Sequence, residues 1–122
     1  MNPRQAEDIL SLAGSVGVAL HKEVVEVNHM LLSTEQQIGL IGEVCTRLKQ
    51  IRTDVLYAYD EEGMDAEEFI LSMGHALLPL AKTKCRLEAK RDNLRLVLNN
   101  LNAAVRASNR FANKLPAIPK SS

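Results

Sequence analysis

The sequence predicts an all-α protein, and three observations support that prediction. Apolar residues recur every three or four positions along most of the chain, and no stretch alternates apolar and polar residues as a strand does. Aromatic residues make up only 3% of the chain, so a core must be built from aliphatic side chains, which suits packed helices. The four prolines, at positions 3, 79, 116 and 119, leave residues 4–78 and 80–115 free of the strongest helix breaker.

Two apolar stripes with helical spacing occupy the first half of the chain, and a polar stretch separates them. Residues 33–37, "STEQQ", interrupt the apolar pattern, and Ser33 with Gln36 has the spacing of a helix-starting capping box. The phase nevertheless continues from Leu31 through Thr34 to Ile38, which argues against a turn. The stripes consist of Ile9, Ala13, Val16, Leu20, Val24, Val27 and Leu31, then Ile38, Ile41, Cys45, Leu48, Val55 and Tyr59.

The clearest break in the helical pattern is "DEEGMDAEE", residues 60–68. Gly63 suits the position just after a helix, where glycine readily adopts a left-handed conformation. Asp65 suits the cap of the next helix, with Glu68 at the capping-box position and acids in the first turn. We therefore expect one helix to end near residue 60 and another to begin near residue 65.

In the last segment, apolar residues fall seven positions apart, which predicts a packed seam along one helix. Pro79 either kinks this helix or starts it, because proline is tolerated in a first helical turn. The repeat begins at Met73 and is interrupted only by Ser108. The predicted core seam consists of Leu80, Leu87, Leu94, Leu101 and Leu115.

Two architectures fit these segments. The stripes are broader than a two-stranded seam requires, which favours an antiparallel bundle of three to four helices, with breaks near residues 33 and 63 and a kink or break at Pro79. The alternative is a long helical hairpin that dimerises into a four-helix bundle. In either case we expect one domain over residues 1–115, followed by a flexible C-terminal tail over residues 116–122.

Charge is distributed unevenly, although the formal net charge is +0. Residues 1–78 carry five basic and thirteen acidic residues, whereas residues 79–122 carry ten basic and two acidic residues. We expect the basic helix to face the acidic helices, where charge pairs select orientation more than they add stability. The same residues are a candidate surface for a polyanion or an acidic partner. This basic surface consists of Lys82, Lys84, Arg86, Lys90, Arg91, Arg95, Arg106, Arg110 and Lys114.

The sequence offers little support for catalysis or metal binding. Glu26 and His29 have the Glu-x-x-His spacing of di-iron bundles, but no second such pair exists. Cys45 lies on an apolar stripe, and Cys85 lies between two basic residues without a recognisable nucleophile motif. We therefore expect no enzyme activity and no catalytic, cofactor-binding or metal site.

No apolar run approaches the roughly 20 residues that cross a membrane, and acids at positions 7 and 8 argue against a signal peptide. Two cysteines without a disulfide framework suit a reducing cytoplasm. We expect a cytoplasmic helical protein–protein interaction module, such as a small subunit, adaptor or chaperone, that forms a homodimer or binds a helical partner. The alternative is a nucleic-acid-binding regulator that uses the basic last helix.

Overall fold

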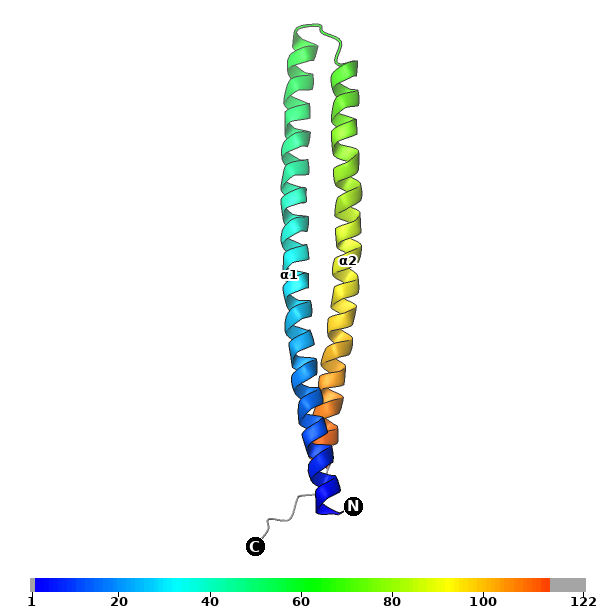
Figure 1. Cartoon of the computed structure of the whole chain (residues 1–122). Coiled ribbons are helices and arrows are strands. Elements are labelled where there is room, and N and C mark those ends of the chain that lie inside the picture. The colour runs from blue at the N-terminus through cyan, green and yellow to red at the C-terminus, as the bar shows by residue number, and fades with distance from the viewer. Residues whose placement is uncertain (1, 115–122) are drawn as a thin grey trace. The chain divides into compact units, whose positions relative to one another are not determined.

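The structure, a computed structural model, describes residues 2–114 and consists of two helices, α1 (Pro3–Glu61) and α2 (Glu67–Lys114). Within this range there is no strand, so the all-α prediction is confirmed. The preference for three to four helices is wrong, and the connectivity is that of the helical hairpin (Figure 1). The expected tail, residues 116–122, lies outside the described residues.

The chain divides into two compact units, and each helix contributes to both. Unit 1 comprises the start of α1, through Leu31, and the end of α2, from Asn93. Unit 2 is continuous in sequence, Leu32–Asp92, and contains the turn. In each unit a stretch of α1 lies beside an oppositely directed stretch of α2 (Figure 1).

Residue 2 caps the start of α1 in a way that the sequence analysis did not anticipate. The Gln5 amide N–H donates to Asn2 Oδ1 at 2.8 Å, and the Asn2 amide N–H donates to Gln5 Oε1 at 3.1 Å. This reciprocal pair is a capping box, which satisfies amides that a helix start leaves without intrahelical partners. Pro3 occupies the first helical position, where its missing N–H is not needed.

The turn between the helices forms as the sequence predicts. Gly63 has φ 66°, and the Gly63 amide donates to the Asp60 carbonyl at 3.2 Å. The Met64 amide donates to the Tyr59 carbonyl at 2.8 Å, which completes a Schellman motif. Asp65 Oδ1 then accepts the Glu67 amide at 3.0 Å and so caps α2.

The predicted break at residues 33–37 is wrong, and Pro79 neither starts nor interrupts a helix. Residues 33–37 are helical, and Thr34 is the most deeply buried side chain described, with 1% of its surface exposed. Every buried side-chain nitrogen or oxygen in the described range has a hydrogen-bond partner, so the Thr34 hydroxyl is accommodated. α2 also continues through Pro79, whose exposed ring lies at the helix surface.

A narrow core lies between the helices in each unit. In unit 1 the buried apolar residues are Ala6, Ala13, Val27 and Leu94, and in unit 2 Met73 is buried. Near the turn of unit 2, the rings of Tyr59 and Phe69 pack with centroids 6.0 Å apart and tie the two helices together. On α1, Ala6, Ala13, Val27 and Thr34 keep the seven-residue phase of a two-helix seam.

Candidate interaction surfaces

The predicted core seam of α2 faces inward to different degrees. Leu94 is buried, whereas Leu80, Leu87 and Leu101 are half-buried. Leu115 lies outside the described residues. In a pair of helices, α1 covers only one side of this row of leucines on α2. Most of the leucines are therefore half-buried.

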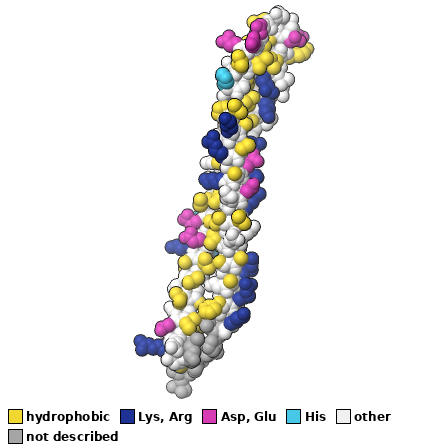
Figure 2. All heavy atoms as spheres, turned by 90° about the vertical axis from the view of Figure 1, so that its right-hand side faces the viewer, with side chains coloured by type: hydrophobic (Ala, Val, Ile, Leu, Met, Phe, Trp, Pro, Cys, Tyr) yellow, Lys and Arg dark blue, Asp and Glu magenta, His cyan; other side chains and the backbone are white. Residues whose placement is uncertain are grey.

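The basic surface is mostly open to solvent. Seven of its nine residues are exposed, and Lys84 and Arg91 are half-buried. Figure 2 shows Lys and Arg side chains bordering hydrophobic side chains over both units. The exposed members are Lys82, Arg86 and Lys90 in unit 2, and Arg95, Arg106, Arg110 and Lys114 in unit 1.

The two half-buried cations are Lys84 and Arg91. They lie seven positions apart and belong to the same seven-residue repeat as Leu77 and Leu98 on the inner side of α2. A methyl group built on Gly42 of α1 would lie 4.0 Å from Lys84 Nζ, so the ammonium group reaches over α1. Arg91 Nε pairs with Asp92 Oδ1 at 3.2 Å, within α2 rather than between helices. The expectation that the basic residues pair with acids of α1 stays a prediction.

Large hydrophobic side chains outside the seam are exposed in both units. In unit 1 they are Leu12, Val16, Val18, Val25, Met30, Leu96, Val97 and Phe111, and in unit 2 they are Leu32, Leu40, Ile51, Tyr57, Met64, Ile70, Leu71 and Leu78. Exposed apolar residues scattered singly need no explanation, but rows of them beside a narrow core mark interaction sites.

In unit 1, some of these residues line an apolar groove between α1 and α2. Leu12 of α1 and Phe111 of α2, which both line it, are 64% and 54% exposed. The groove has a volume of about 460 Å³. We call it the unit 1 groove; its lining residues are Ile9, Leu12, Ala13, Val16, Ala107, Ser108 and Phe111.

The sequence analysis did not identify the unit 1 groove. It placed Ile9, Ala13 and Val16 on one inward stripe, whereas of these three only Ala13 is buried and Val16 is 41% exposed. The width of the stripes was the available signal. It did not reveal which residues would line this groove, because that depends on the rotation of each helix against its neighbour.

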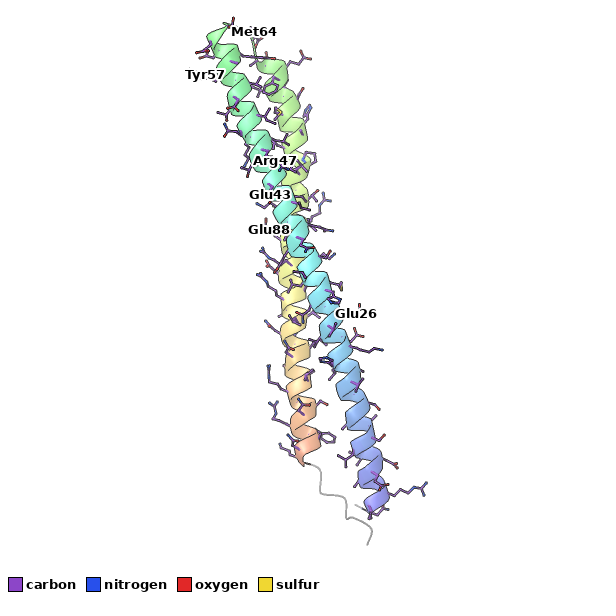
Figure 3. All side chains as sticks on the ribbon, turned by 90° about the vertical axis from the view of Figure 1, so that its left-hand side faces the viewer. Glu26, Glu43, Arg47, Tyr57, Met64 and Glu88 are labelled. Carbon is purple, nitrogen blue, oxygen red and sulfur yellow. The ribbon has the colours of Figure 1, made fainter. Side chains whose placement is uncertain are left out.

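The turn end of unit 2 carries a strongly acidic surface with apolar residues in it. Residues 54–68 contain seven acids and no basic residue. Tyr57 on α1 and Met64 in the turn are 67% and 58% exposed and line a shallow pocket together with Asp60 (Figure 3). We call residues 54–68 the acidic turn; its acids are Asp54, Asp60, Glu61, Glu62, Asp65, Glu67 and Glu68.

The remaining chemical candidates do not form a site. Glu26 and His29 are both exposed on α1, and no group of three or more potential metal ligands occurs within residues 2–114. Cys45 is half-buried, Cys85 is exposed, and neither is in a disulfide. No helix in the described part of the chain is long and apolar enough to cross a membrane.

Comparisons of the chain with protein-family models, with curated proteins and with solved structures find no match.

Proposed function

We propose that this chain is a non-enzymatic interaction module whose apolar helix faces bind the helices of another protein chain. The observation that carries the proposal is the imbalance between the narrow core and the rows of exposed large hydrophobic residues in both units. Burying such side chains is favourable by roughly 1.5–3 kcal/mol each. A further layer of helices, as in a four-helix bundle, would cover them.

A pair of exposed residues in unit 2 allows the proposal to be tested. Leu40 on α1 and Leu78 on α2 are 61% and 57% exposed, so polar replacements leave the core between the helices intact. Tagged wild-type chain and the Leu40→Gln/Leu78→Gln variant are cross-linked in the native host and purified. We expect the wild type in a stoichiometric complex with a second copy or another helical chain, and the variant largely released from it.

The control exchanges exposed polar residues, Asn28→Gln with Asn93→Gln, and should leave the complex unchanged. Circular dichroism confirms that all three proteins are equally helical. If the wild-type chain is recovered alone, or if the leucine variant keeps the complex, the apolar faces are not the binding surface.

A second candidate function, nucleic-acid binding, is supported by the seven exposed members of the basic surface. Cations spaced along one helix suit a phosphate backbone, which needs charge density more than shape. Against it, Phe111 is the only aromatic residue between positions 79 and 122, so stacking on bases has little support. Salt-sensitive nucleic-acid binding by the unaltered protein would favour this second candidate.

A further inference from the structure

We propose that a second copy of this chain covers the unit 1 groove, and that it does so with its acidic turn. This inference rests on the proposed function and deepens it, because it names the partner and the surfaces that meet. It is supported by the apolar lining of the groove, the cations along one edge of it, and the matching acids around the exposed apolar residues of the turn.

The groove offers an apolar surface of the right kind. Leu12 and Val16 of α1 and Phe111 of α2 all line it, and the rest of the lining is apolar apart from Ser108. The free energy falls when apolar side chains of a partner fill this exposed groove and exclude water from it. Exposed Tyr57 and Met64 on the acidic turn provide such an insert.

Charges along the groove select an acidic partner. Arg110 lies three positions after Ala107, and Lys114 lies three positions after Phe111, so both exposed cations border the α2 wall. Residues 93–114 contain no acid. On the α1 wall, Asp8 lies one turn before Leu12 and offsets part of this charge, which leaves the groove edge with a net positive charge.

The acidic turn has the opposite charge and is accessible. Asp60, Glu61, Glu62 and Asp65 are all exposed, and they lie within four positions of Met64 in the sequence. Complementary charge steers two surfaces together and fixes their register even where each exposed pair adds little affinity. The acidic turn, with apolar side chains among acidic residues, therefore complements the unit 1 groove, which is apolar and bordered by basic residues.

Each copy carries both surfaces, so the acidic turn of one copy can enter the unit 1 groove of another. The competing contact would place acidic turn against acidic turn, where like charges repel. Charge therefore selects the contact between an acidic turn and a unit 1 groove.

Cross-linking tests the register directly. In a Cys45→Ala/Cys85→Ser background, one protein carries Met64→Cys and a second, of different tag size, carries Ala107→Cys. Both are mixed and treated with a short bis-maleimide. We expect the mixed product, Met64→Cys joined to Ala107→Cys, to dominate over the two products that join like copies. The same mixture in urea gives the level of random cross-linking.

A charge exchange tests the electrostatic part. Reversing Arg110 and Lys114 to Glu should weaken the association of two copies about tenfold, because two charge pairs are lost at each contact. Adding Glu61→Lys and Glu62→Lys to that variant should restore most of the affinity. The matched control reverses Lys82 and Lys90, which are exposed cations of unit 2, and should change the dissociation constant by about twofold or less.

The outcomes separate this inference from the proposed function. Dominant cross-links between like copies, or a charge exchange that fails to restore affinity, would overturn the contact between the acidic turn and the unit 1 groove. A protein that stays monomeric by light scattering would overturn the second copy as the partner. In either of these cases the proposed function stands if the leucine variant still loses a helical partner in the host, and it fails if that variant keeps one.

Discussion

Gly63 is the residue on which the turn depends. Its φ of 66° lies in the left-handed region, where a side chain on Cβ collides with the backbone. We expect Gly63→Ala to lower the free energy of unfolding by about 1 kcal/mol. Urea unfolding followed by circular dichroism measures this change.

Gly39 provides the matched control for that substitution. It lies inside α1, is exposed, and has no atom within 4 Å of the position that a Cβ would take. Gly39→Ala should therefore raise stability by up to about 1 kcal/mol, because alanine favours a helix. If both substitutions act in the same direction, the left-handed turn is not an important constraint on the fold.

Leu94 tests the seam of α2. It is the buried member of the predicted leucine row, so Leu94→Ala should cost roughly 2–5 kcal/mol through lost burial and the cavity left behind. The control is Asn93→Ala at the exposed neighbouring position, which should change stability by less than about 0.5 kcal/mol. Equal effects of the two substitutions on the urea midpoint would place the seam elsewhere.

Residue-scale features were predictable from sequence where the backbone demands a particular residue type. Gly63 and Asp65 were identified in this way, because a left-handed turn and a helix cap have strong preferences. The burial of Thr34 was not predicted, although the apolar phase runs through this position. Its hydroxyl counted as part of a polar interruption, but threonine is small and can bond to its own helix, so it fits a seam position.

At the scale of the helix, α2 continues through Pro79. Proline in a helix interior removes one backbone hydrogen bond and crowds the preceding turn. We expect Pro79→Ala to stabilise the protein by roughly 1–3 kcal/mol, since α2 would gain a donor and lose a steric conflict. Thermal unfolding at fixed protein concentration measures the gain. A loss of stability would mean that the proline ring makes packing contacts that outweigh its cost.

The basic surface of α2 distinguishes the two candidate functions. If the interaction module is the function, we expect weak binding of nonspecific duplex or single-stranded nucleic acid at physiological salt, measured by fluorescence anisotropy. If nucleic acid is the ligand, affinity should fall steeply with salt, and reversing Lys82, Arg86 and Lys90 to Glu should abolish binding without loss of stability. Tight, salt-sensitive binding by the unaltered protein would contradict the first expectation.

Helix bounds were predictable to within a few residues at the turn, because a cap and a left-handed glycine mark it. The number of helices was not. Residues 33–37 were given a break and Pro79 a kink or break, yet both occur in helices whose apolar phase runs on unchanged. Continuity of phase was the better guide here, since Thr34 is the one residue of the polar stretch that is buried in the seven-residue seam.

At the scale of the whole molecule, the broad apolar stripes indicated more helices than one chain supplies. The sequence assigned that width to a bundle within the chain, whereas the structure leaves the outer parts of the stripes exposed. The members of the basic surface could be named from the sequence. The grouping of Arg110 and Lys114 with Phe111 at a groove could not, because it requires the rotation of α2 against α1.

Dependence of stability on protein concentration tests whether folding and association are linked. If two copies unfold together, a hundredfold dilution lowers the free energy of unfolding by about 2.7 kcal/mol, and the melting temperature falls by several degrees. Replacing Leu12 and Phe111 with Gln should remove this dependence, because both line the unit 1 groove. Asn28→Gln, at an exposed polar position of unit 1 outside that groove, serves as the control and should keep it. A wild-type melting temperature that does not change with dilution would mean that the helical pair is stable alone, and that its apolar faces are held open for a different partner.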